Sequence, residues 1–225
     1  QPDVFEDVTR TGKSFGIVGW YHSYCANMGI EAKRCWTAPP VPLPPYDYNI
    51  VRKTLDILRS SATIVQSIRR RETERDSYAR GFAAELVTDS TIDFAYLHLP
   101  IPHSPSLRSF RGNDYLGNVM RADSTLGVLR AAMENAGLWD DAAIIVTSDH
   151  GTSAEELGVH DPSRPADERS RDVPLMIKLP GQSTAAVMDK PTTTLVLASL
   201  IPAILARNVT TAAQLEQHLM KKSPE

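Results

Sequence analysis

The stretch Ala142–Gly151, Ala-Ala-Ile-Ile-Val-Thr-Ser-Asp-His-Gly, joins an apolar run to a group of chemically active side chains. Residues Ala143–Thr147 are apolar or β-branched, and they predict a fully buried strand. Asp149 and His150 follow that run at once, and ligands of open α/β sheets bind just outside the carboxyl ends of strands. Gly151 permits the chain to turn there, so that two neighbouring side chains can face the same side.

Two interpretations of this turn are open from the stretch alone. A carboxylate oxygen and an imidazole nitrogen are a common pair of ligands for a divalent metal ion, which would make Asp149 and His150 a metal site. The alternative is a plain turn in which the carboxylate of Asp149 hydrogen-bonds its own backbone. The choice between them depends on the rest of the chain.

The composition is that of an ordinary globular protein. The chain has 225 residues, of which 42% are hydrophobic and 23% are charged. Its net charge of -3 gives no sign of a nucleic-acid partner. No apolar run reaches the roughly 18 residues that a membrane-spanning helix needs. The two cysteines, Cys25 and Cys35, fit either a disulfide in an oxidising compartment or two thiols in the cytosol.

Periodicity along the chain predicts helices and strands in alternation. Apolar positions with a helical period predict helices at 4–10, 48–71, 75–88, 113–137, 192–206 and 211–220. Runs of β-forming residues predict strands at 15–20, 92–99, 143–147 and 172–179, and prolines make 38–45 an extended connection. This order predicts a single α/β domain over residues 1–225, with a mostly parallel central sheet flanked by helices.

Three of these strands, at 15–20, 92–99 and 143–147, each end in Asp or His residues. Parallel strands place their carboxyl ends on one edge of a sheet, so these side chains are expected to converge on one site. His22 follows the first of the three strands and His98 lies within the second. Each of these two histidines is expected to have a structural role, packing against neighbours or hydrogen-bonding to them.

Two further histidines are candidates for contact with a ligand. His103 lies between two prolines, which hold the backbone extended and stiff just after the 92–99 strand. Its alternative is a partly exposed loop histidine without a function. His160 lies in a polar, proline-containing loop over residues 158–171, long enough to suggest a functional role.

The segment Tyr115–Gly151 resembles the alkaline phosphatase superfamily, in its sulfatase and phosphoethanolamine-transferase branches. In both, a helix with a conspicuous Asp, here Asp123, leads through Gly-Leu-Trp-Asp-Asp to Thr-Ser-Asp-His-Gly. Three other segments are similar to the family in the expected order, over most of residues 14–205: Gly16–Tyr24, Pro102-His103-Ser104-Pro105 and Val173–Gly181.

The resemblance implies a hydrolase or transferase that acts on small-molecule sulfate or phosphate esters. Asp149 and His150 match the family's ligands to a divalent metal ion, for which Ca, Mn and Zn are all candidates. His103 matches its catalytic, substrate-contacting histidine, and His160 is a candidate for substrate binding. The resemblance also favours a periplasmic or other extracytoplasmic location, and it makes a Cys25–Cys35 disulfide reasonable.

Two parts of the family pattern have no counterpart in this sequence. They are the nucleophile, a Ser, Thr or formylglycine-forming Cys at the start of a helix, and the first acidic pair of metal ligands. Neither Cys25 nor Cys35 begins a Cys-x-Pro-x-Arg sequence. We therefore expect the chain to be the carboxyl-terminal portion of a larger sulfatase-like protein, inactive by itself. The alternative function is a non-catalytic sulfatase-like domain that binds a ligand.

Overall fold

The computed structural model describes residues 4–20, 22–28, 32–38, 76–102, 115–151, 173–189 and 191–220. Its labelled elements are α1 (Val4–Arg10), β1 (Phe15–Gly19), α2 (Tyr24–Met28), β2 (Arg34–Thr37), β3 (Phe94–Leu97), α4 (Tyr115–Asn135), β4 (Ile144–Thr147), β5 (Leu175–Lys178), η1 (Thr194–Val196), α6 (Leu197–Leu205) and α7 (Ala212–Met220). A further helix covers 76–87. The expected helix at 48–71, the loop at 158–171 and the proline-rich connection after Ala38 lie outside the described residues.

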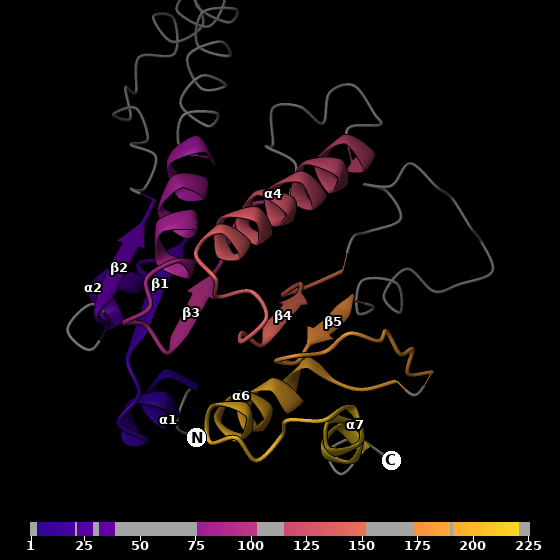
Figure 1. Ribbon diagram of the computed structural model, residues 1–225. Helices are drawn as coiled ribbons and strands as arrows, with labels where there is room; N and C mark the ends of the chain where they lie inside the picture. The colour runs from indigo at the N-terminus through magenta and orange to yellow at the C-terminus, as the bar shows by residue number, and fades with distance from the viewer. Residues whose placement is uncertain are drawn as a thin grey trace, which may run out of the picture.

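Three parallel strands form the larger of the two sheets in the described part of the chain. β1 lies between β2 and β3 and pairs in parallel with both. In Figure 1 the 76–87 helix and α4 lie on one side of the strands, and α1, α6 and α7 lie on the other. The structure therefore confirms the predicted α/β class, a parallel sheet flanked by helices.

The side chains of β1 alternate between two apolar layers, and all five residues of the strand are buried. Val18 packs in a cluster with the 76–87 helix and α4, which includes Ala83 and Leu129. Phe15 and Ile17 point to the other layer, which α1 supplies. Because both faces of β1 are covered, the strand is apolar throughout rather than alternating with polar residues.

The strand predicted at 143–147 forms as β4, but its surroundings differ from the prediction. β4 pairs with β5 in an antiparallel two-stranded sheet, and the described residues give it no pairing with the parallel sheet. Its residues are half-buried or exposed instead of fully buried. The prediction was wrong on both points because a short apolar run does not reveal which strand will pair with it.

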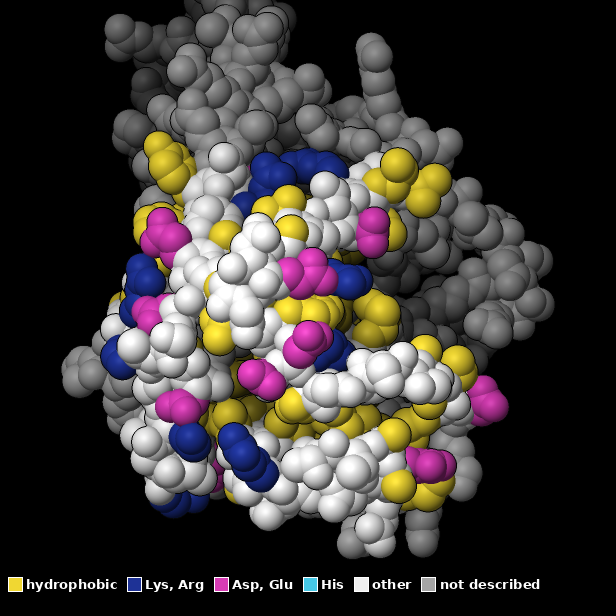
Figure 2. Space-filling model, viewed as in Figure 1, with side chains coloured by type: hydrophobic (Ala, Val, Ile, Leu, Met, Phe, Trp, Pro, Cys, Tyr) yellow, Lys and Arg dark blue, Asp and Glu magenta, His cyan; other side chains and the backbone are white. Residues whose placement is uncertain are grey.

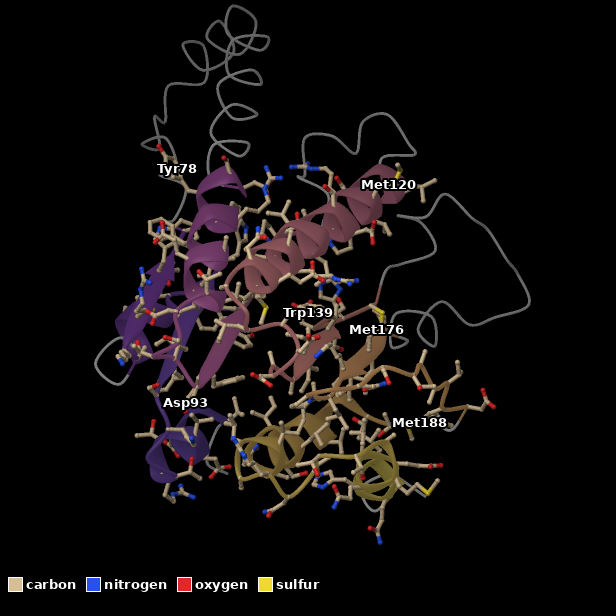
Figure 3. All side chains as sticks on the ribbon, viewed as in Figure 1. Tyr78, Asp93, Met120, Trp139, Met176 and Met188 are labelled. Carbon is tan, nitrogen blue, oxygen red and sulfur yellow. A yellow bond between two sulfur atoms is a disulfide. The ribbon has the colours of Figure 1, made fainter. Side chains whose placement is uncertain are left out.

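The ammonium group of Lys178 in β5 and the indole ring of Trp139 join α4 to the two-stranded sheet. Lys178 at the end of β5 donates from Nζ to the carbonyl oxygens of Trp139, at 2.8 Å, and Ala142, at 3.1 Å. The same ammonium group lies 5.2 Å from the centre of the Trp139 ring, and Arg130 of α4 lies 5.1 Å from it. Figure 3 shows Trp139 between α4 and the β4–β5 pair. These contacts therefore hold the chain between α4 and β4 against β5.

Two short elements, α2 and β2, were not predicted from the sequence. A disulfide between Cys25 in α2 and Cys35 in β2 joins them, so the structure selects the disulfide from the two alternatives. Thr37 supports the same junction, because its hydroxyl oxygen accepts a hydrogen bond from the backbone N–H of Cys25 at 3.2 Å. Elements this short have too few residues to show a period, so tertiary contacts decide them.

On the face seen in Figure 2, the described residues form no extended area of a single charge sign. Basic and acidic side chains are interspersed over the face seen in Figure 2. This pattern agrees with the small net charge and offers no extended basic surface there for nucleic acid. Within the described residues, no helix combines the length and the apolar character required to cross a membrane.

Candidate active site

His98 lies directly after β3, in line with two aromatic residues of that strand. Alternation places Phe94, Tyr96 and His98 on the same face of the sheet. The backbone N–H of His98 donates to the carbonyl oxygen of Val18 at 2.8 Å, which continues the pairing with β1. The backbone of His98 is therefore held by the parallel sheet itself.

Tyr24, at the start of α2, holds the imidazole of His98 from one side. Its hydroxyl oxygen lies 2.8 Å from Nδ1 of His98, and the two rings meet edge to face. Gly19 makes room for this arrangement, because a Cβ atom there would overlap the ring of Tyr24. His22 stacks on His98 with ring centres 5.9 Å apart, so both histidines and the tyrosine form one ring cluster.

The electrostatic environment of the cluster keeps its two central groups uncharged. Burial, followed by Tyr96 and Asp149, raises the pKa of the Tyr24 phenol far above its usual value. Burial also lowers the pKa of the His98 imidazole below 6.5, although Asp149 opposes this effect. At neutral pH Tyr24 therefore keeps its proton, and His98 is a neutral imidazole with one protonated nitrogen.

The turn after β4 brings together the residues that the sequence singled out as metal ligands. The backbone N–H of His150 donates to Oδ1 of Asp149 at 3.1 Å, which is the local hydrogen bond that the plain-turn interpretation predicts. Nδ1 of His150 lies 2.8 Å from the carbonyl oxygen of Gly151 and donates to it, because a carbonyl can only accept. Whenever this ring carries a single proton, its lone pair is therefore on Nε2.

The carboxylate of Asp149 connects this turn to the cluster at the ends of β1 and β3. Its Oδ2 lies 3.9 Å from Nε2 of His98, and its Oδ1 lies 3.9 Å from Nε2 of His150. His98 and Asp149 therefore lie close together, but not for the predicted reason, because in the described residues β4 does not belong to the parallel sheet that contains β3. Each oxygen of the carboxylate faces a different histidine.

Asp149 and His150 fit one part of a coordination shell. Two ligands with bonds of about 2.1 Å to one ion can be 3.9 Å apart, as Oδ1 and Nε2 are. Both side chains are about two-thirds exposed, so a cation could reach them. The described residues contain no group of three or more His, Cys, Asp or Glu side chains that could hold a metal ion. Since even catalytic zinc sites use three protein ligands, further ligands would be required.

The structure tests the other predicted residues only in part. His103 and His160 lie outside the described residues, so their roles stay predictions. Asp123 lies on an exposed part of α4. The sequence assigned His98 to packing and left Tyr24 without a role. The role of His98 could have been inferred from the alternation of Phe94, Tyr96 and His98 at the end of a strand. No sequence pattern indicated a role for Tyr24, because α2 itself was not predicted.

A comparison with models of protein families identifies the family of this chain. The model of the sulfatase family matches residues 71–207, more than half of the chain, and the chain therefore belongs to the sulfatase family. The match covers His98 and the turn at Asp149. Tyr24 and the Cys25–Cys35 disulfide lie outside the matched residues. It gives no particular support to the phosphoethanolamine-transferase branch. No match was found among curated proteins.

Proposed function

We propose that the protein carrying this chain is a metal-dependent hydrolase of small-molecule sulfate or phosphate esters. The observation that carries the proposal is the position of the Asp149 carboxylate, between Nε2 of His150 and Nε2 of His98 at 3.9 Å from each. Membership of the sulfatase family supports the reaction class. Activity assays determine whether the substrate is a sulfate or a phosphate ester and whether the acceptor is water. The same assays distinguish among Ca, Mn and Zn as the metal.

In this proposal each residue has one task. Asp149 and His150 hold the divalent ion, which when bound lowers the pKa of the nucleophile and neutralises charge on the transferring group. His103 binds the substrate and donates a hydrogen bond or a proton to an ester oxygen. His160 contacts the substrate. The nucleophile and the remaining metal ligands come from outside this chain, which we infer is inactive alone and forms the carboxyl-terminal part of the catalytic domain.

The Cys25–Cys35 disulfide supports an extracytoplasmic location for this enzyme. Disulfides persist in the periplasm and outside the cell, and they are rare in the reducing cytosol. We therefore propose a periplasmic or extracellular hydrolase. Labelling of free thiols in unreduced, denatured protein tests this point, because both cysteines should resist alkylation.

The proposed activity is tested on the full-length protein with aryl sulfate and aryl phosphate monoesters, in the presence of Ca²⁺, Mn²⁺ or Zn²⁺. Asp149→Ala should lower kcat/KM by more than about 100-fold, since loss of groups behind a ligand already costs about 10–100-fold. Asp189→Ala is the matched control, because Asp189 is exposed and lies outside the candidate site. Full-length protein that is inert toward every ester and metal would contradict the hydrolase.

A non-catalytic domain that binds a ligand is the second candidate. The hydrogen bond from His150 N–H to Asp149 Oδ1 favours it, because the turn is then satisfied without a metal ion. The two candidates differ in one measurement. A binding domain would bind sulfate or phosphate esters in calorimetry and release no product, whereas the hydrolase turns them over.

A further inference from the structure

We propose that Tyr24 and His98 are positioning residues for the Asp149 carboxylate. The Tyr24 hydroxyl donates to Nδ1 of His98, and the remaining ring proton, on Nε2, is directed at Oδ2 of Asp149. This inference rests on the proposed function, in which Asp149 uses its other oxygen, Oδ1, as a metal ligand. Neither Tyr24 nor His98 contacts the ion or the substrate in this arrangement.

The position of the proton on the His98 ring follows from the hydrogen bond with Tyr24 and the longer contact with Asp149 taken together. A neutral imidazole carries one proton, and the 2.8 Å contact between Tyr24 and Nδ1 allows either partner to donate. If Nδ1 carried the proton, the lone pair on Nε2 would face the negative Oδ2 of Asp149 at 3.9 Å. If Tyr24 donates, Nε2 carries the proton and presents a positive N–H to the same oxygen. The second arrangement is favourable at both nitrogens, because Nδ1 accepts from Tyr24 and Nε2–H faces the Asp149 carboxylate.

The cluster of Tyr24 and His98 is also held more firmly than the turn at Asp149 that it faces. His98 is held by its backbone hydrogen bond to Val18. Tyr24 is adjacent to the disulfide at Cys25. Asp149, in contrast, belongs to a short exposed turn. A donor held by the sheet next to an exposed carboxylate favours the rotamer in which Oδ2 faces the donor, and this leaves Oδ1 on the side of His150. Outer-shell partners of metal ligands act in this way.

The distance of 3.9 Å between His98 Nε2 and Asp149 Oδ2 exceeds that of a hydrogen bond by about 1 Å. Hydrogen bonds of a catalytic site are often long in the free protein and shorten when its ligands bind. We expect this contact to shorten in the same way when the site is filled, by rotation of the exposed Asp149 side chain.

The tautomer of His98 can be read directly by ¹H–¹⁵N correlation spectra of the histidine-labelled chain, without metal or ester. Wild-type His98 should show an unprotonated Nδ1 and a protonated Nε2. Tyr24→Phe, which removes only the hydroxyl, should raise the Nδ1–H tautomer from an undetectable to a measurable share. Asp149→Asn should shift the Nε2 resonance. Tyr78→Phe, at an exposed tyrosine, should leave the His98 signals unchanged.

Three results would overturn the proposal: a proton on Nδ1 in the wild type, equal tautomer populations in wild type and Tyr24→Phe, or an unchanged Nε2 resonance in Asp149→Asn. The wild-type and Asp149→Asn spectra decide the question even if Tyr24→Phe does not fold. No spectrum depends on turnover. An inert full-length enzyme would contradict the proposed function but not the tautomer assignment. An unexpected tautomer would contradict the role of Tyr24 and His98 but not the proposed function.

Discussion

The two halves of the candidate site are built in opposite ways. At the ends of β1 and β3, His98 is buried except for 19% of its side chain, and it is held by Tyr24 and by the sheet. At the end of β4, Asp149 is 65% exposed, and its hydrogen bond stays within the turn. The first half is therefore formed by the fold, whereas the second is a pair of exposed side chains in a local turn.

This difference assigns different tasks to the two halves. A buried, hydrogen-bonded imidazole has little freedom and suits orientation of a neighbour. An exposed carboxylate with an adjacent imidazole suits capture of a cation, because it can exchange water for the ion. Changes to the first half should therefore lower stability and, through the position of Asp149, also activity, whereas changes to the turn should lower activity with little effect on stability.

Removal of the disulfide should have the largest effect on stability. Cys25→Ser with Cys35→Ser opens a loop with a sequence separation of 10 residues, which should lower the free energy of unfolding by about 2–3 kcal/mol. Urea denaturation under oxidising conditions measures the change. The ring signals of Tyr24 and His98 should move, while those of His150 stay in place. Unchanged stability would show that the sheet alone fixes the first half.

Lys178→Met should destabilise the β4 half by about 2 kcal/mol. The substitution leaves the carbonyl oxygens of Trp139 and Ala142 without their ammonium donor. Lys13→Met is the matched control, since Lys13 pairs with Asp93 at an exposed position and should cost less than about 1 kcal/mol. Equal losses in the two variants, measured by thermal denaturation, would contradict a special role for Lys178.

Asp93→Asn tests the opposite end of the β1–β3 pair. The backbone N–H of Ser14 first, and then Lys13, lower the pKa of the Asp93 carboxyl. A lowered folded-state pKa stabilises the protein above the unfolded value of about 3.9, and this stabilisation is lost as the pH falls through the folded-state pKa. The variant should be less stable than wild type by about 1 kcal/mol or less at pH 7. The difference should disappear in denaturation curves recorded in acid.

Asp149→Asn should have the smallest effect on stability, within about 0.5 kcal/mol of wild type, because the side chain is exposed. The same variant should lose most of the hydrolysis by the full-length protein. Parallel denaturation and activity measurements therefore separate the two halves. A clear loss of stability would mean that the turn after β4 is part of the folded frame.

The sequence predicted the elements with a long period or a clear end signal. The helix at 113–137 formed as α4, and Gly137 adopts the left-handed conformation expected after its last turn, with φ of 69°. The pairing of β4 was not predictable, because its apolar run fits a parallel or an antiparallel neighbour. α2 and β2 were missed because a disulfide and contacts distant in sequence hold them.

The sequence by itself determined that Asp149 and His150 leave a strand at a turn, since that depends only on neighbouring residues and on Gly151. It also determined the family, because the motifs occur in order along the chain. Only the tertiary structure decided which groups meet the carboxylate of Asp149. Tyr24 and His98 are 74 residues apart along the chain, and they become neighbours because β1 and β3 pair side by side.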